Sequence, residues 1–321
     1  MKNKKLIIGI FMFALLIPSI SVASAAEVTS LDDIITAGKM VVACEAGYPP
    51  FEMKNTTTEE IYGFDPDIMA FIAEDMDIEI EYRDVSWDVI FTSLAAGNYD
   101  CVMSAVTITS ERMESMDFTR WYYFSTQSVM VTTANPKNIS TIGDVNDTSV
   151  KVGVQATTTS QWYLEDEEYV SEMVTYATIT LAIEALDSGA VDVVLGDDAT
   201  LVAGQAINPG NFEIVDRFSP EAFGIACQKG STALVDRMNT ALDKLLGTNE
   251  SSPVFSDYYN ETHYKWMNAS ASVDEAALKI ALDSYKATGG NIISGASILS
   301  LIVVIPVATF GIILKIKRKK D

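Results

Sequence analysis

The sequence has 321 residues, with 22 basic and 44 acidic side chains and a formal net charge of −22. Eight of the basic residues lie at the two ends, so the chain between them is even more acidic, and such a body repels nucleic acids. One histidine and three cysteines are too few for a His/Cys metal site or a Ser-His-Asp centre, and no cofactor is expected.

Residues 1–26 have the pattern of a secretory signal peptide. A charged start, KNKK, precedes the short apolar run LIIGIFMFALLIP and the small residues SVASAA. The apolar run is too short for a comfortable membrane span, which favours a signal peptide over a membrane anchor. The mature chain is therefore expected to begin near residue 27.

Helical and strand patterns alternate over residues 30–106. SLDDIITAG (30–38) predicts a helix with Ser30 as its cap and Gly38 as its stop, and KMVVAC (39–44) predicts a buried strand. A second helix is expected from Asp65 as N-cap, with Pro66 in its first turn. Further expected elements are a strand at 78–85, a helix at 87–98 and a strand at 99–106. This alternation indicates an α/β fold with right-handed crossovers.

A second set of alternating elements begins near residue 128. The expected strands are 128–133, 150–155, 191–198 and 223–228, with helices at 180–189, 232–247 and 253–260. The three cysteines, Cys44, Cys101 and Cys227, fall in apolar strand-like runs and are expected to be buried free thiols. Residues 268–291 contain a capping box from Ser272 to Glu275 and are expected to form a helical stalk or linker.

The C-terminal region predicts a membrane anchor. Residues 292–314 are uncharged and mostly apolar, long enough to span a bilayer, and KIKRKKD (315–321) follows as a basic cytoplasmic tail. A buried core helix fits poorly, because the basic cluster directly abuts the apolar run. The body is therefore expected outside the cell. Six N-glycosylation sequons agree with this location and suggest a glycoprotein of an archaeal cell surface: Asn55, Asn138, Asn146, Asn249, Asn260 and Asn268.

Eight stretches in order over residues 31–267 carry a family resemblance. They are YPPFE (48–52), GFDPDIMAFIAE (63–74), VSWDVIFTSLAAGNYD (85–100), TITSER (107–112), DFTRWYY (117–123), VGVQATT (152–158), ALDSGAVDVVLGDD (185–198) and FGIACQKG (223–230). The sequence resembles the extracytoplasmic solute-binding proteins of polar amino acid ABC importers, such as the lysine/arginine/ornithine-, histidine- and glutamine-binding proteins.

The resemblance implies a two-lobed periplasmic-binding-protein-like (type II) fold, with two crossing strands at the hinge. Residues 27–267 would form the solute-binding domain. Lobe one would comprise 31–128 and 218–267, and lobe two 129–217. The implied partners are a free L-amino acid, held between the lobes, and the permease subunits of an ABC importer.

The resemblance also implies which residues contact the ligand. Arg112 would bind the ligand carboxylate through two parallel hydrogen bonds, and Asp197 would accept from its ammonium. Side chains with supporting roles are expected at the ligand-facing strand end (Ser104, Ala105, Thr107), around the ligand side chain (Tyr48, Trp87), at its distal end (Glu45, Gln155) and at a helix start (Thr159). The carboxylate of Glu45 favours a basic or amide ligand over an acidic one.

One position departs from the family pattern. Thr157 stands where the family usually has glycine before a Thr pair, which puts the local geometry of Thr158 and Thr159 in question. Two other functions stay open. One is an enzyme on this scaffold, a prephenate/arogenate dehydratase-like protein with Glu45 as general acid, and the other is a ligand-sensing ectodomain. An intact Arg112 and Asp197 pair favours binding over catalysis, and a seven-residue tail is too short for a signalling domain.

Overall fold

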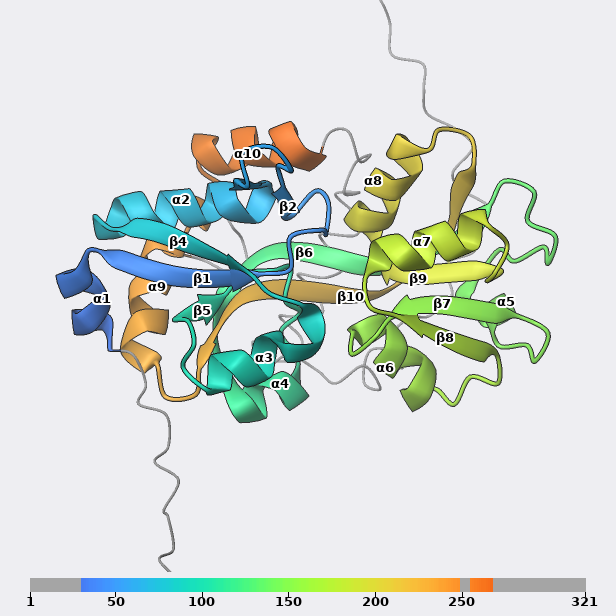
Figure 1. The fold of residues 1–321 in the computed structure, drawn as a ribbon, viewed down its shortest axis with the longest axis horizontal. Helices are drawn as coiled ribbons and strands as arrows, with labels where there is room; N and C mark the ends of the chain where they lie inside the picture. Colours follow the sequence, from blue (N-terminus) through green and yellow to red (C-terminus); the bar gives the residue numbers. More distant parts are fainter. Residues whose placement is uncertain (1–29, 249–254, 268–321) are drawn as a thin grey trace, which may run out of the picture.

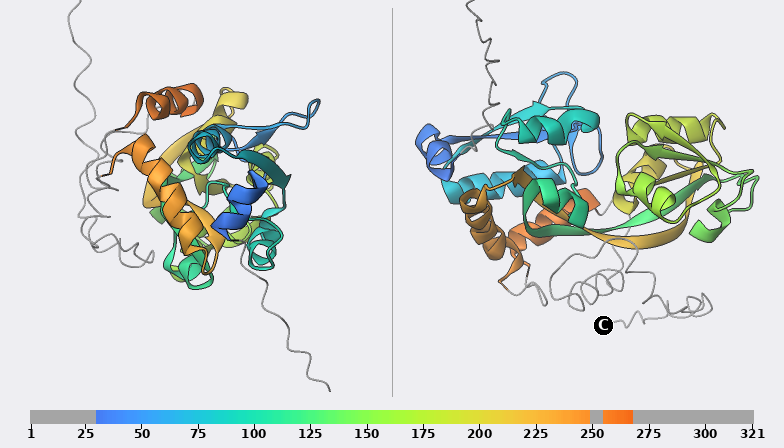
Figure 2. Two further views of the ribbon diagram at one scale, coloured as in Figure 1. Left: turned by 90° about the vertical axis from the view of Figure 1, so that its left-hand side faces the viewer. Right: turned by 90° about the horizontal axis from the view of Figure 1, so that it is seen from below.

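The computed structural model describes residues 30–248 and 255–267, and the fold has two α/β lobes (Figure 1). Within the described residues, eight strands form one sheet in the order β4-β1-β5-β10-β6-β9-β7-β8. Strands β10 and β6 lie in its centre and are shared by both lobes, as the side view in Figure 2 shows. The two-lobed fold expected from the sequence is therefore present.

Lobe one contains the N-terminal elements and the last two described helices. Its helices are α1 (Leu31–Ala37), α2 (Phe64–Met76), α3 (Trp87–Ala95), α4 (Ser110–Ser115), α9 (Thr232–Leu246) and α10 (Asp257–Met267). Its strands are β1 (Lys39–Cys44), β4 (Glu79–Asp84) and β5 (Cys101–Val102), with the separate pair β2 (Met53–Lys54) and β3 (Ile61–Tyr62).

Lobe two is formed by the middle of the chain. Its helices are α5 (Ile142–Val145), α6 (Thr159–Asp166), α7 (Ile179–Asp187) and α8 (Asp198–Ile207). Its strands are β7 (Lys151–Gln155), β8 (Glu172–Tyr176) and β9 (Val193–Asp197).

Two long antiparallel strands connect the lobes. They are β6 (Met116–Thr132) and β10 (Phe212–Gln228), which pair along almost their whole length with several register shifts. The lobe boundaries expected at 128/129 and 217/218 fall inside these two strands. A hinge built from two paired strands restricts the relative motion of the lobes mainly to bending of this ribbon.

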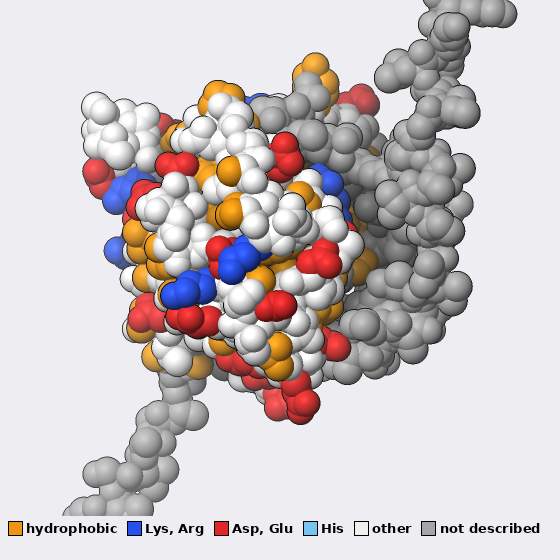
Figure 3. All heavy atoms as spheres, turned by 90° about the vertical axis from the view of Figure 1, so that its right-hand side faces the viewer, with side chains coloured by type: hydrophobic (Ala, Val, Ile, Leu, Met, Phe, Trp, Pro, Cys, Tyr) orange, Lys and Arg blue, Asp and Glu red, His pale blue; other side chains and the backbone are white. Residues whose placement is uncertain are grey.

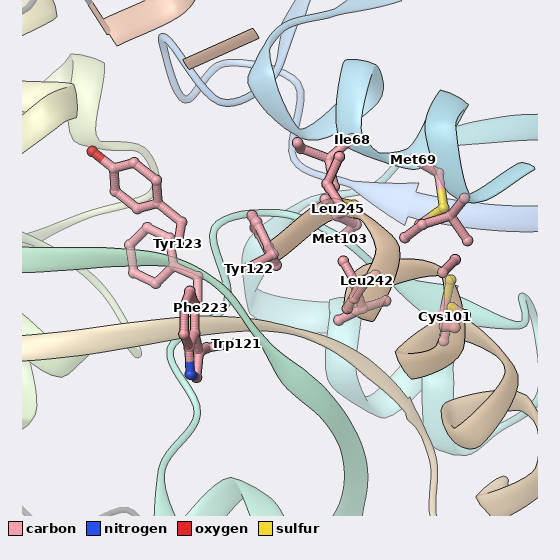
Figure 4. Close-up of a cluster of buried hydrophobic side chains, with 14 of the residues drawn as sticks. Ile68, Met69, Cys101, Met103, Trp121, Tyr122, Tyr123, Phe223, Leu242 and Leu245 are labelled. Carbon is pink, nitrogen blue, oxygen red and sulfur yellow. The ribbon is translucent and has the colours of Figure 1, made fainter. Parts of the chain in front are cut away.

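Each lobe has its own hydrophobic core. In lobe one, side chains of α2 and α9 pack on β5 and on the aromatic residues of β6 and β10 (Figure 4). Lobe two has two smaller clusters, one containing Val152 and Leu195 and the other Ile179 and Leu201. Cys44, Cys101 and Cys227 are buried and free, as expected from their apolar surroundings in the sequence.

Some local expectations need correction. Helix α2 begins at Phe64 with Gly63 as its N-cap, so Asp65 is not the cap; its buried carboxylate accepts from distant groups instead. Strand β5 has two residues rather than the expected eight, because the chain after Val102 leaves the sheet, with Ala105 at φ +45°. Strand β8 and helix α8 were not expected from the sequence pattern, whereas α6 begins at Thr159, where the resemblance implied a helix start.

Two further expectations concern the surface and the C-terminal segment. Figure 3 shows acidic side chains spread over the outer end of lobe two, with fewer basic ones among them. Within residues 30–248 and 255–267, no helix has the length and apolar character of a membrane span. The expected signal peptide, stalk, span at 292–314 and basic tail lie outside the described residues.

Candidate functional site

The carboxyl ends of the parallel strands meet between the two lobes. Strand β1 runs parallel to β5 in lobe one, and β7 runs parallel to β9 in lobe two. Polar side chains follow or end these strands, namely Glu45 after β1, Ser104 after β5, Gln155 at the end of β7 and Asp197 at the end of β9. In open α/β sheets, ligands bind at the carboxyl ends of strands, so this is where a site is expected.

A cavity lies at this junction. The space between its walls, including the part open to solvent, is about 330 Å³. Its lining contains all ten residues singled out in the sequence: Glu45, Tyr48, Trp87, Ser104, Ala105, Thr107, Arg112, Gln155, Thr159 and Asp197. Glu52 and Thr158 also line it and were not singled out, although both lie in or beside the matched stretches.

Arg112 carries a buried positive charge against the cavity. The residue is 5% exposed, and its Nη1 donates to the carbonyl of Thr107 at 2.9 Å. Its Nε has no hydrogen-bond partner, and no aspartate or glutamate of the described residues forms an ion pair with it. Burial lowers the pKa of the guanidinium to about 10, so it remains charged at neutral pH.

Three aromatic rings surround the Arg112 guanidinium. Its Cζ lies 5.4 Å from the ring centroid of Trp87, 5.1 Å from that of Phe91 and 4.9 Å from that of Trp162. Trp162 was not identified from the sequence, and it is the only ring of the three from lobe two. Its position in the first turn of α6, three residues after Thr159, is the signal that could have located it. The rings hold the cation in place without neutralising it.

Asp197 approaches the cavity from lobe two. Its Oδ2 accepts from the hydroxyl of Tyr48 at 2.5 Å, and its Oδ1 accepts from Gln127 Nε2 at 2.8 Å. Burial, and then the charge of Glu221, raise the pKa of Asp197 well above its usual value. The next residue, Asp198, pairs with Arg217 and accepts from Ser128.

Glu221 on β10 is a second, partly buried acid beside the site that the sequence did not reveal. Its Oε2 accepts from the hydroxyl of Thr107 at 2.7 Å, and burial raises its pKa. The charge of Arg112 opposes this rise. No local pattern around Glu221 marks it, because it sits in the hinge strand just before FGIACQ.

Direct hydrogen bonds join the lobes around the cavity. Besides Tyr48 with Asp197, Gln155 Nε2 donates to Glu45 Oε2 at 2.7 Å, and Trp87 Nε1 donates to the carbonyl of Thr157 at 3.2 Å. Burial raises the pKa of Glu45, while the bond from Gln155 acts in the opposite direction. The structure therefore has the lobes in contact, with the predicted distal pair, Glu45 and Gln155, bonded across the gap.

The departure at Thr157 leaves the backbone in the conformation that glycine favours. Thr157 has φ +58°, in the left-handed region that side chains with a branched Cβ rarely adopt. The next residue, Thr158, caps α6 by position, and its hydroxyl donates to the carbonyl of Gln155 at 2.8 Å. The local geometry questioned from the sequence is thus kept, with strain at Thr157.

Comparison with known proteins agrees with this geometry. The model of bacterial extracellular solute-binding proteins, family 3, matches residues 40–261. The chain belongs to this family.

Two relatives illustrate the sequence similarity within the family. A probable histidine-binding protein of Neisseria gonorrhoeae is 32% identical over 226 residues, covering 68% of this chain and 82% of that protein. The ABC transporter glutamine-binding protein GlnH of Bacillus subtilis is 30% identical over 235 residues, covering 71% of this chain and 81% of that protein. Both are amino-acid-binding proteins.

Solved structures show the same fold. An ancestral arginine-binding protein bound to arginine matches with a TM-score of 0.64 and 30% identity, covering 71% of this chain and 98% of that one. An ancestral amino acid-binding protein, a precursor of cyclohexadienyl dehydratase, matches with a TM-score of 0.66 and 29% identity, covering 73% and 98%.

Proposed function

We propose that this chain is a membrane-anchored extracytoplasmic receptor that binds a basic or amide amino acid between its lobes and delivers it to an ABC importer. The observation that carries the proposal is the pair of Arg112 and Asp197, which reach one cavity from opposite lobes. The chain belongs to a family of solute-binding proteins, and the residues of the site support a narrower class of solute within it.

The charges of the cavity suit a zwitterion. A free amino acid has a carboxylate and an ammonium on one carbon, and these groups need a cation and an anion placed close together. Arg112 supplies a cation without an ion-pair partner among the described residues, and Asp197 and Glu221 supply acids. A ligand held by both lobes stabilises the closed arrangement, so binding and closure become one event.

The other end of the cavity favours a basic or amide side chain. Glu45 accepts a hydrogen bond from Gln155 at this end, and Tyr48 and Trp87 line the cavity with aromatic surface. A guanidinium or ammonium would neutralise the partly buried carboxylate of Glu45, whereas a ligand carboxylate would be repelled by it. Relatives named for binding histidine, glutamine and arginine support this range.

The surface agrees with an exterior location. The sequon asparagines in the described part of the chain are all exposed: Asn55, Asn138, Asn146 and Asn260. We propose that residues 292–314 anchor the chain, that residues 1–26 direct its export and that the exposed sequons carry glycans, as on an archaeal cell surface.

An enzyme is the second candidate, favoured by the match to a dehydratase precursor and by the raised pKa of Glu45. Incubation of the protein with prephenate and arogenate, followed by product analysis, separates the two functions. Turnover that is lost in Glu45→Gln would favour the enzyme.

A thermal-shift screen of the full-length protein with the twenty standard amino acids and ornithine, followed by calorimetry of the best ligand, tests the receptor proposal. We expect arginine, lysine, ornithine, histidine or glutamine to raise the melting temperature, because a ligand that binds only the folded state stabilises it. Stabilisation by glutamate that exceeds all of these would contradict the ligand class. A folded protein that responds to no amino acid would contradict the receptor function.

A further inference from the structure

At the lobe-one wall of the cavity, two carboxyl groups lie buried against each other, Glu52 in the lining and Asp65 outside it. Glu52 is 0% exposed and Asp65 is 1% exposed, and both belong to lobe one. They are brought together because the backbone of Gly63 lies very close to that of Phe51. A Cβ added to Gly63 would be 2.1 Å from the carbonyl oxygen of Phe51, so only glycine fits here. The amide of Asp65 also donates to that carbonyl at 3.0 Å, which holds the chain at Glu52 on the first turn of α2.

Three donors satisfy two of the four carboxyl oxygens in this pair. Glu52 Oε1 accepts from the Ser104 hydroxyl at 2.7 Å. Asp65 Oδ2 accepts from the amide of Ala105 at 2.9 Å and from the hydroxyl of Tyr122 at 2.8 Å. The other oxygen of each group, Glu52 Oε2 and Asp65 Oδ1, is buried and has no donor. Two carboxylate oxygens only accept, so two ionised groups cannot satisfy each other.

We infer that Glu52 and Asp65 share one proton, and that this pair is a positioning device that holds Glu45 and Ser104–Ala105 along the cavity wall. A proton on Glu52 Oε2 donates to Asp65 Oδ1 and satisfies both remaining oxygens at once. Asp65 keeps the negative charge because it has two donors and lies in the first turn of α2, where the helix dipole favours an anion.

The surroundings of the pair favour a retained proton. Neither group forms an ion pair with a lysine, arginine or histidine of the described residues, and Lys54 pairs instead with Glu59 and Asp84. The charge of Glu45, after β1, raises the pKa of Glu52 further. The other titratable side chains near the pair carry no positive charge, and the pair raises their pKa values: Cys44 on β1, Tyr48 in the following loop, Tyr82 on β4 and Tyr122 on β6. His263, which packs on the ring of Phe64, has its pKa lowered by burial and stays neutral.

The direction of both pKa shifts agrees with this geometry. Burial and the charge of Asp65 raise the pKa of Glu52 well above 4.5, and burial raises that of Asp65 to about 6. Both directions agree with a proton that the pair retains.

The pair reaches the cavity wall through short chains of hydrogen bonds. Ser104, which donates to Glu52, accepts from the amide of Glu45 at 3.0 Å. Ala105, which donates to Asp65, stands at φ +45°, a conformation that needs such a fixed partner. The ends of β1 and β5 are therefore both tied to the protonated pair, and this consequence for ligand binding rests on the proposed function.

The first test measures the free energy of unfolding of the full-length protein against pH. Glu52 carries its proton in the folded state and loses it on unfolding above pH 4.5, so the folded parent loses stability as pH rises. Glu52→Gln supplies a permanent donor to Asp65, and Asp65→Asn supplies one to Glu52, so neither variant needs the proton. Relative to either variant, the unfolding constant of the parent should rise about tenfold per pH unit above that value. Glu79→Gln, at an exposed position on β4, is the control and should follow the parent.

Either variant that folds but keeps the parent's pH dependence overturns the shared proton. If neither folds, infrared spectroscopy of the parent decides, since a protonated buried carboxyl has a carbonyl band distinct from that of a carboxylate. A parent without that band at neutral pH, or one whose band disappears in the Asp197→Asn/Glu221→Gln variant, overturns the inference, and a band that persists in this variant supports it.

A second arm uses L-arginine as the binding probe. Glu52→Ala removes the acceptor of Ser104 and the donor of Asp65, and should weaken L-arginine binding at least tenfold. Glu52→Gln should recover most of that loss, and equal losses in the two variants would overturn the positioning role. If the parent binds no L-arginine while the pH dependence behaves as expected, the proposed ligand fails and the shared proton stands.

Discussion

Arg112 and Asp197 have different electrostatic environments. Arg112 keeps its charge in a buried aromatic setting without an ion pair among the described residues. Asp197 lies beside Glu221, and burial together with this neighbour raises its pKa well above the usual value. Arg112 can therefore bind an anionic group of a ligand, whereas Asp197 and Glu221 favour a cationic group.

Replacement of Arg112 tests the carboxylate contact. Arg112→Lys keeps the charge but loses the planar pair of donors, and Arg112→Ala loses both, so affinity for the best amino acid should fall in that order. For alanine we expect a loss of about 2–5 kcal/mol, or roughly 30-fold to several thousand-fold. Calorimetric titration measures it, with the ligand-free melting temperature as the folding control. A folded alanine variant that binds like the parent would show that the ligand carboxylate lies elsewhere.

Ligand binding should release protons. Burial raises the pKa values of Asp197 and Glu221, so the ligand-free pair holds its protons to higher pH than free carboxyl groups do, and a ligand ammonium favours both ionised forms. Affinity should therefore increase as pH rises above about 4, the ordinary pKa of a carboxyl group. Calorimetry in two buffers of different ionisation enthalpy counts the protons, and Asp197→Asn should bind weakly and release fewer. An affinity that falls over this pH range would refute the assignment.

At the scale of elements, the start of α6 places three features of the site in a few residues. The carbonyl of Thr157 accepts a hydrogen bond from Trp87 in the other lobe, Thr158 is the N-cap by position, and the ring of Trp162 lies against Arg112. The turn that makes this possible needs a left-handed residue, and here it is Thr157, at φ +58°. A helix start of this kind serves as one wall of the cavity because its backbone is fixed before any ligand arrives.

Thr157→Gly should relieve the strain at this turn. A left-handed conformation costs a non-glycine residue about 1–2 kcal/mol, and the added freedom of glycine in the unfolded chain cancels part of the gain. We expect the free energy of unfolding to rise by about 0.5–1 kcal/mol, measured by urea denaturation. Thr158→Gly, outside the left-handed region, is the matched control and should destabilise. A destabilised Thr157→Gly would mean that the threonine hydroxyl contributes more than the strain costs.

At the scale of the whole molecule, the site is independent of the chain ends. Every residue that lines the cavity lies between Glu45 and Asp197, and both cores are formed by residues 34–267. A fragment of residues 27–290 should therefore fold and bind the same amino acid as the full chain, with affinity within about threefold by calorimetry. A fragment that folds but loses binding would assign part of the site to the terminal segments.

Protease treatment of intact cells tests the proposed orientation of the molecule. If residues 292–314 anchor the chain with the basic tail inside, external protease should remove the body and leave a short membrane-bound remnant. Lysed cells provide the control for protease access. Full protection of the body in intact cells would contradict the exterior location.

The sequence by itself determined the local features and the residue types of the site. Helix α1 begins after Ser30 and ends before Gly38 as its capping residues predict, and all ten expected residues line one cavity. These features depend on neighbours along the chain and on an ordered set of motifs. Only the tertiary structure decided the pairings across the lobes: Tyr48 with Asp197, 149 positions apart, and Gln155 with Glu45, 110 apart. It also decided the contact of Trp162 with Arg112 and the burial of Glu52 against Asp65. Local sequence patterns do not specify such contacts, because they join residues that are far apart in the chain.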